Sequence, residues 1–223
     1  MEKYFDLLMA NPLFAGISRE ELASMRGCRN ARATQVKKGD PVFLEGDAAG
    51  FIGIVLSGAV RIVRDDYYGQ RSFLTQAEPG DIFAEAYACA PMEAMPISGY
   101  AAADSQVMLL SARKMLTVCT NACGFHNRLV KNLLAVVAEK NLLLSRKIQF
   151  MSQRTTREKL LAYLLDQAKQ HGCDEFTIAL DRQALADYLG VERSAMSAQL
   201  SKLRRDGVLE AAGAHFRLLN KNR

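Results

Sequence analysis

Residues 181–206 are expected to form two short helices joined by a tight turn, and three polar residues near the start of the second have types and spacing that suit base recognition in DNA: Arg193, Ser194 and Ser197. An apolar stripe at i, i+4 and i+7 turns them outward, and it consists of Met196, Leu200 and Leu203. Arginine can donate two hydrogen bonds to a guanine edge, and serine can donate or accept at several bases. The later turns suit phosphate contacts through Lys202, Arg204 and Arg205. This side of the helix therefore predicts a DNA-binding surface.

A shorter helix just upstream is expected to position that surface. Asp181 can cap its first turn, and Leu185 and Leu189 stand four residues apart on its inner face. Gly190 can adopt the positive φ of a helix stop, and Ala186 lets two helix axes cross closely. The layout is typical of a helix-turn-helix, whose second helix enters the major groove. The alternative from these residues alone is a small helical hairpin with a solvated basic face.

The composition is typical of an ordinary globular protein, with 49% hydrophobic and 24% charged residues among 223. A net charge of +5 permits a polyanionic partner without requiring one. The unbroken apolar runs, such as residues 133–138, are far too short for a bilayer. Asp6, Asn11 and Pro12 interrupt the N-terminal apolar stretch, which excludes a typical signal peptide. We therefore expect a cytoplasmic protein with no membrane partner.

The cysteines are odd in number and scattered, which favours free thiols in a reducing compartment. They are Cys28, Cys89, Cys119, Cys123 and Cys173. Cys119 and Cys123 are spaced to share one helical face, where they could ligate a group or simply be buried structural residues. No CxxC pair or histidine-rich cluster is present, so we predict no metal and no cofactor. No catalytic spacing stands out around the three histidines, so we do not expect an enzyme.

Residues 31 to about 111 contain short apolar runs punctuated by glycine, a pattern typical of a β-sandwich or barrel. Ser57-Gly58 separates two such runs and predicts a hairpin turn. No glycine-rich phosphate loop of the dinucleotide-binding or P-loop kind is present. The expected strands are Ala33–Val36, Pro41–Leu44, Phe51–Leu56, Ala59–Val63, Arg71–Gln76, Ile82–Ala84 and Gln106–Leu110.

A long helix is predicted from about Cys123 to Met151, because apolar residues recur there at spacings of three and four. It is apolar on two sides, so we expect one side to pack within the chain and the other on the same helix of a second copy. The alternative is a single wide core face. The expected dimer contacts are Leu129, Leu133, Val136 and Leu143.

The expected fold class is α+β, in three parts. Residues 1–122 are expected to form a β-roll or jelly-roll sensing domain, preceded by a capped helix from Arg19 to about Met25, and residues 123–151 the dimerisation helix. Residues 152–223 follow as a winged helix-turn-helix domain, with a helix from Thr156 to His171, a strand over Phe176–Leu180 and a hairpin around residues 211–214.

This order of elements resembles the Crp/Fnr family of bacterial transcription regulators over essentially the whole chain. The segments that carry the resemblance are Lys38–Asp40, Phe43–Asp47, Leu56–Val60, Gly80–Glu85 and the helix-turn-helix. The resemblance implies a homodimer, a small-molecule effector held between roll and long helix, and RNA polymerase as a partner. It also implies recognition helices that enter successive major grooves of a palindromic operator in double-stranded DNA.

The resemblance places the effector against residues 84–97 and one turn of the long helix. Members that bind cyclic AMP hold its ribose with a glutamate, matched here by Glu85, and its phosphate with an Arg-Ser pair, at whose positions this chain has Met95 and Pro96. A buried phosphate without a cation or hydroxyl pair is uncompensated, so an apolar or aromatic effector is expected instead of cyclic AMP. The implied site is Gly80, Glu85, Tyr87, Met95, Pro96, Leu144 and Ser145.

The recognition helix matches the family at Arg193, its first base-contacting arginine, whereas Ser194 stands where a glutamate is frequent. Ala198 replaces a second arginine that many members carry, so we expect fewer guanine contacts per half-site.

A regulator that senses redox state or a gas remains the alternative. Its sensor would be the Cys119/Cys123 pair, or His126 as an axial ligand of haem, where a surface or capping histidine is the simpler interpretation. The iron–sulfur branch of the family is a poor match, because Cys28 is the one cysteine near the N-terminus.

Overall fold

The computed structural model describes residues 2–24, 31–68, 70–116 and 124–219. The chain packs as two compact units, residues 1–139 and 140–223. The division falls within one long helix, α5 (Gly124–Met151). The first part of this helix belongs to the first unit and the rest to the second. The predicted α+β class is confirmed: a β-sheet unit, the long helix and a winged helix-turn-helix follow one another along the chain.

Short helical segments precede the sheets: a 3-10 turn (Glu2–Tyr4), α1 (Phe5–Ala10), a second 3-10 turn (Pro12–Phe14) and α2 (Arg19–Ser24). Asn11 fixes the middle of this segment. Its Oδ1 accepts from the backbone N–H of Leu13 at 2.9 Å, and its amide donates to the carbonyl of Gly80 at 2.7 Å. The predicted capping box before α2 is confirmed, because the N–H of Ser18 donates to the Glu21 carboxylate and the N–H of Glu21 to Ser18 Oγ.

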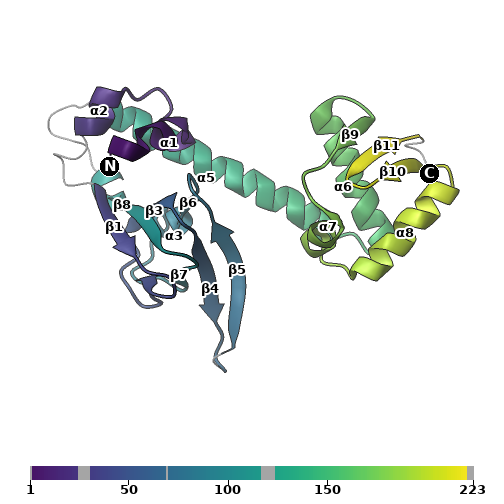
Figure 1. Cartoon of the computed structure of the whole chain (residues 1–223), viewed down its shortest axis with the longest axis horizontal. Helices are drawn as coiled ribbons and strands as arrows, with labels where there is room; N and C mark the ends of the chain where they lie inside the picture. Colours follow the sequence, from purple (N-terminus) through teal and green to yellow (C-terminus); the bar gives the residue numbers. More distant parts are fainter. Residues whose placement is uncertain (1, 25–30, 69, 117–123, 220–223) are drawn as a thin grey trace. The chain divides into compact units, whose positions relative to one another are not determined.

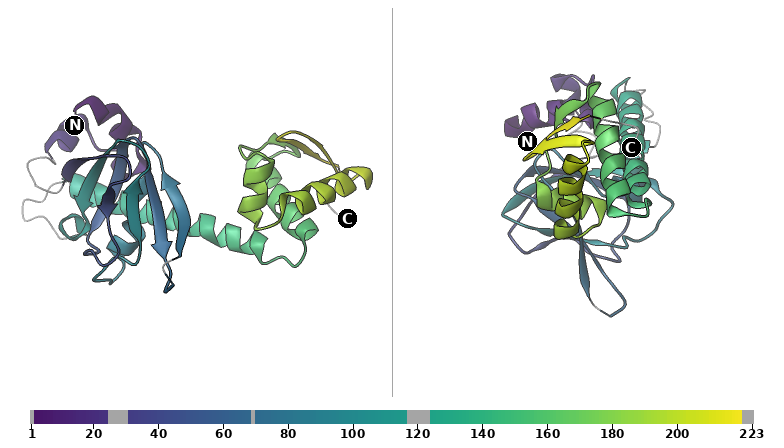
Figure 2. Two further views of the ribbon diagram at one scale, coloured as in Figure 1. Left: turned by 60° about the horizontal axis from the view of Figure 1, so that its bottom comes forward. Right: turned by 90° about the vertical axis from the view of Figure 1, so that its right-hand side faces the viewer.

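Two four-stranded antiparallel sheets form the sandwich of the first unit (Figure 1, Figure 2). Their strand orders are β1-β8-β3-β6 and β2-β7-β4-β5. Each predicted strand is present, whereas β7 has no predicted counterpart because Ser-Gly-Tyr-Ala contains no apolar run. The elements are β1 (Ala31–Val36), β2 (Pro41–Phe43), β3 (Phe51–Ser57), β4 (Val60–Asp65), β5 (Arg71–Ala77), β6 (Ile82–Phe83), α3 (Glu85–Cys89), β7 (Ser98–Ala101), β8 (Ser105–Ser111) and α4 (Ala112–Leu116).

The turn at Ser57-Gly58 is not a hairpin, contrary to the prediction. β3 pairs with β6 and β8, and β4 pairs with β5 and β7, so this turn carries the chain from one sheet to the other. Gly58 has φ 79°, and a Cβ at this position would lie 2.3 Å from Ser105 Oγ. Both the backbone conformation and the space therefore require glycine at the crossing.

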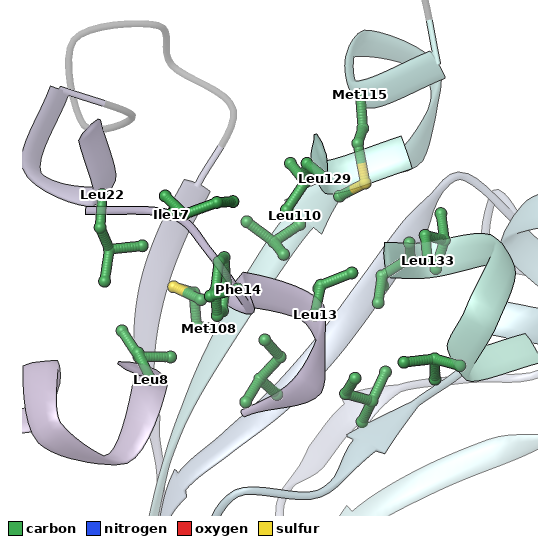
Figure 3. Packing of buried hydrophobic residues seen from close by; sticks show 14 of the residues in the cluster. Leu8, Leu13, Phe14, Ile17, Leu22, Met108, Leu110, Met115, Leu129 and Leu133 are labelled. Carbon is green, nitrogen blue, oxygen red and sulfur yellow. The ribbon is translucent and has the colours of Figure 1, made fainter. Parts of the chain in front are cut away.

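The first part of α5 completes the core of the first unit. Figure 3 shows Leu129 and Leu133 of this helix beside Leu13 and Leu110, and all four belong to one buried cluster. Val136 lies in the same cluster. The structure thus differs from the expectation that Leu129, Leu133 and Val136 contact a second copy: they are buried within their own protomer. A helical apolar pattern predicts burial but does not identify the surface that covers it.

Helix α5 also carries exposed apolar residues. Leu134 is 70% exposed, although its neighbour Leu133 is 2% exposed. Leu143, the remaining predicted dimer contact, is 51% exposed. Further along, Leu142, Leu144 and Ile148 are each more than half exposed. Leu142, Leu143 and Leu144 are consecutive and point in different directions around the helix, whereas Leu134, Leu144 and Ile148 lie on one side and are called the apolar stripe of α5.

The second unit is a winged helix-turn-helix, as predicted. Its sheet has the order β10-β11-β9, and its elements after α5 are α6 (Thr156–His171), β9 (Glu175–Thr177), α7 (Arg182–Leu189), α8 (Arg193–Arg205), β10 (Leu209–Ala212) and β11 (His215–Leu218). Thr155 and Glu158 form a capping box that starts α6. The last turn of α5 packs here through Phe150, whose ring lies 5.7 Å from that of Tyr163.

Candidate nucleic-acid interface and effector site

The turn between α7 and α8 fixes the direction in which α8 leaves. Asp181 caps α7 by accepting from the N–H of Ala184 at 2.8 Å, as its position before the helix predicts. Gly190 ends α7 with φ 60°, and the N–H of Val191 donates to the carbonyl of Ala186. These contacts form the left-handed stop that glycine favours, so the predicted turn of the helix-turn-helix is confirmed in its geometry.

The buried side of α8 consists of Met196, Leu200 and Leu203, as the stripe predicts. The opposite side of α8 is therefore free for another molecule. All six residues predicted to contact DNA are exposed on it: Arg193, Ser194, Ser197, Lys202, Arg204 and Arg205. The helix begins with Arg193 and Ser194, and three basic residues occupy its last turn. The structure thus places all the predicted residues on one helix, with Arg193 and the two serines in its first turns and the other three cations in its last turn.

Arg182 is a candidate contact that the sequence reasoning missed. It follows the Asp181 cap at the start of α7, and its guanidinium lies over the Phe216 ring, 4.9 Å from the centroid. Its Nη1 is buried and has no hydrogen-bond partner among the residues that the structure describes. Burial, and then the charge of Arg204, lower the pKa of Arg182. An anion near both guanidiniums would relieve this repulsion.

A hollow of about 1070 Å³ lies between α8 and the sheet of the second unit. One wall is the C-terminal half of α8, where Ser201, Arg204 and Arg205 face it. The other wall is formed by residues of β9, β10 and β11. The hollow is open to solvent, and its charged lining has three arginines against two glutamates, which suits a strand of nucleic acid better than a small apolar molecule.

The predicted effector residues divide between the two units. Gly80 turns the chain before β6 with φ 95°, and its N–H donates to the carbonyl of Val55 at 2.8 Å. Glu85 is buried at the first position of α3, whereas Tyr87 and Pro96 are half-buried. Leu144 and Ser145 are exposed on α5 in the second unit.

Met95, one of the predicted effector residues, lies inside a packed core. It is 1% exposed and belongs to a buried cluster with Phe43 and Phe83, whose rings stack at 6.1 Å. Its backbone is also held, since its N–H donates to the carbonyl of Asp47 at 2.8 Å. The apolar surroundings of Met95 offer a buried phosphate no compensating charge. Ala84 beside it has φ 63°, the one positive value among the described non-glycine residues.

The alternative sensor residues are only partly described. Cys119 and Cys123 lie outside the described residues, as does Cys28. His126 is 8% exposed and stacks on Phe125, with 4.6 Å between ring centroids, so it is not the surface residue of the simpler interpretation. Its Nδ1 is buried and without a hydrogen-bond partner in the described part of the chain. Cys89 and Cys173 are exposed free thiols.

Within residues 2–24, 31–68, 70–116 and 124–219, no group of three or more histidine, cysteine, aspartate or glutamate side chains could hold a metal ion. None of the helices in those ranges is both long and apolar enough to cross a membrane.

Two family models match the chain: the cyclic nucleotide-binding domain over residues 33–122 and the Crp-like helix-turn-helix domain over residues 158–223. The probable transcriptional regulator flp of Lacticaseibacillus casei is 27% identical over 216 residues, covering 94% of this chain and 92% of that protein. The cyclic AMP receptor protein of Thermus thermophilus is 25% identical over 202 residues, which cover 91% of this chain and 89% of that protein. The crystal structure of DNR from Pseudomonas aeruginosa has a similar fold, with a TM-score of 0.51 at 22% identity. The match covers 99% of this chain and 95% of that one.

Proposed function

Because the chain belongs to the Crp/Fnr family of transcription regulators, we propose that it acts as a homodimer that binds a palindromic operator under the control of a small apolar or aromatic effector. DNA binding and regulation of transcription are properties of this family. For this chain we propose the dimer, the operator, the effector and the residues that contact DNA.

The exposed side of α8 carries the proposal. Arg193, Ser194 and Ser197 stand at the end of the helix that enters a major groove first, and the three cations follow where phosphates lie. Ala198 stands between them without a polar group, which supports few guanine contacts per half-site.

The test is a selection of bound sequences from a random DNA library by the purified protein. We expect a palindrome whose half-sites are about 10 base pairs apart, one helical turn. Binding that is weak, salt-labile and independent of sequence, both alone and with candidate effectors, would contradict the proposal.

The apolar stripe of α5 supports the dimer. Leu129, Leu133 and Val136 are covered within the protomer, so the contacts are assigned to exposed residues of α5, which are Leu143, as predicted, and the apolar stripe of Leu134, Leu144 and Ile148. Leu134, Leu144 and Ile148 lie on one side of this long helix, and exposed apolar residues on one side fit a parallel pair with the same helix of a second copy. The mass in sedimentation equilibrium is expected to be twice that of one chain.

The core around Met95 supports an effector other than cyclic AMP. A cyclic phosphate at this position would meet apolar side chains and Pro96 instead of an Arg-Ser pair. Calorimetry with cyclic AMP should therefore detect no micromolar binding, whereas a panel of aromatic and apolar compounds should contain a ligand that changes operator affinity. Tight binding of polar anions alone would count against this effector class.

His126 favours one second candidate function, a gas-sensing regulator with haem. The observation is its buried Nδ1, which lacks a hydrogen-bond partner among the described residues. A visible absorption spectrum of the freshly purified protein distinguishes the two candidates. A Soret band that disappears in His126→Ala would favour the haem sensor. A colourless protein would favour the organic effector.

RNA polymerase is the proposed protein partner. The support is the family membership, since regulators of this kind act at promoters. Transcription from a template that carries the selected operator upstream of a promoter should change when the protein is added, and an operator with scrambled half-sites is the control.

A further inference from the structure

The outer face of the second unit's sheet carries four charged or titratable side chains in mutual contact. His215 of β11 stands beside β9, where Thr177 Oγ1 lies 3.2 Å from its Nδ1 and Glu175 Oε1 lies 3.1 Å from its Nε2. Arg217 lies 3.9 Å from the second Glu175 oxygen and 3.8 Å from the Glu210 carboxylate of β10. The strand register causes this grouping, because His215 is opposite Thr177 and Arg217 is opposite both Glu175 and Glu210.

This face is one wall of the hollow beside α8. His215, Arg217, Glu175 and Glu210 all line it, opposite Arg204 and Arg205 of the helix. The charged groups that face His215 are thus the two glutamates on the neighbouring strands, Arg217 on its own strand and the two arginines of α8. The hollow is lined by three arginines and two glutamates, so its net charge is +1 when His215 is neutral. Protonation of His215 raises this net charge to +2.

We propose that the hollow is a clamp for the phosphates of one DNA strand and that protonation of His215 strengthens the clamp, so that operator affinity rises as pH falls. The proposal deepens the function given above and rests on the contact of α8 with the major groove. It assigns Arg217 as a phosphate contact in addition to the cations of α8, and His215 as a positive charge that neutralises Glu175 beside the phosphates.

The two partners of the imidazole allow this change without any movement of the backbone. In the neutral ring Nε2–H donates to Glu175, and Nδ1 accepts from the Thr177 hydroxyl. In the protonated ring both nitrogens donate, and the hydroxyl rotates to accept. Both hydrogen bonds survive, while the imidazolium offsets the charge of Glu175, which otherwise repels a phosphate.

The sign of the effect follows from linkage. A phosphate in the hollow favours the charged form of the ring, so DNA binding takes up a proton at His215. Histidine is the side chain type that ordinarily changes its charge between about pH 5 and pH 8. Operator affinity therefore increases as pH falls through this window.

The experiment measures the dissociation constant of the full-length protein and its selected operator by fluorescence anisotropy at pH 8 and pH 6, over a series of salt concentrations. At pH 6 we expect tighter binding and a slope of log K against log salt that is steeper by about 0.9 per half-site, as one added positive charge beside the phosphates gives. His215→Gln keeps a hydrogen-bonding side chain at an exposed position but does not titrate, so it should bind at both pH values as the natural protein does at pH 8. His215→Lys, with a permanent charge, should bind tightly at both.

The matched control is His171→Gln, which removes the other histidine of the second unit. His171 is exposed on α6 and stacks on Phe176, with 5.6 Å between ring centroids, and it does not line the hollow. This variant should retain the full pH effect. Operator binding that is selective but independent of pH, or a pH effect that survives in His215→Gln, overturns the clamp alone. Absence of selective binding at every pH overturns both the clamp and the proposed function.

Discussion

Arg193 and Lys202 lie on the same helix but are expected to contact different parts of the DNA. Arg193→Ala should reduce discrimination at one base pair of the half-site by about 1–3 kcal/mol, because a bidentate contact to guanine is lost. Lys202→Ala should instead weaken binding to all sequences alike and reduce the salt slope by about 0.9 per half-site. Anisotropy titrations against operators with single base-pair changes separate the two. An unchanged sequence preference in Arg193→Ala would exclude its role as a base contact.

Tyr163 gives a prediction that concerns stability in alkaline solution. Burial, followed by the neighbouring Tyr188, raises the pKa of Tyr163 to about 12. The unfolded chain loses this proton at its ordinary pKa near 10, so the folded state holds the proton more tightly between the two values. The free energy of unfolding should therefore fall as pH rises from about 10 to about 12. Urea unfolding of Tyr163→Phe in this range should show a weaker decline than that of the natural protein.

The residues of the candidate interface could be predicted where local chemistry decides the structure. Asp181 as a cap and Gly190 as a stop follow from their own side chains, and the outward side of α8 follows from its apolar stripe. Arg182 could not be predicted in the same way, because its importance depends on Phe216 and Arg204, which are distant in sequence.

The neighbours Leu133 and Leu134 of α5 test two separate functions of one helix. Leu133→Ala should cost about 2–5 kcal/mol of stability, because it leaves a cavity in the core of the first unit. Leu134→Ala should change stability by no more than about 0.5 kcal/mol, since the side chain is exposed, but it should weaken the dimer. Denaturant unfolding and sedimentation measure the two effects. Equal stability losses in both variants would contradict the assignment of the two sides.

The elements themselves were largely predictable, and their partners were not. Alternation and glycine placement identify β1 to β6 and β8, because those signals are local. The Ser57-Gly58 turn resembles a hairpin in sequence, but strands that follow one another need not pair, and β3 pairs with β8 across more than forty intervening residues. For the same reason the apolar pattern of α5 predicted that Leu129, Leu133 and Val136 are buried, but not that residues of their own protomer cover them.

The whole molecule is expected to depend on a second copy for its tight DNA binding. Leu144→Glu combined with Ile148→Glu places like charges on the apolar stripe of both protomers, so the dimer should dissociate. Both side chains are more than half exposed, so each unit should keep its fold. Sedimentation should show the mass of one chain, and affinity for the palindrome should fall towards that for a single half-site. A dimer that persists would place the interface elsewhere.

The sharing of α5 between the two units also affects the order in which the chain can fold during its synthesis. β1 pairs along its whole length with β8, with Ala31 opposite Leu110, and the core between them is covered by Leu129, Leu133 and Val136. A nascent chain therefore cannot close its first unit until residue 136 has left the ribosome. For the same reason a recombinant fragment that ends at residue 122 leaves that core open to water and should aggregate. A fragment that ends after residue 139 contains the three residues that cover the core and should stay in solution.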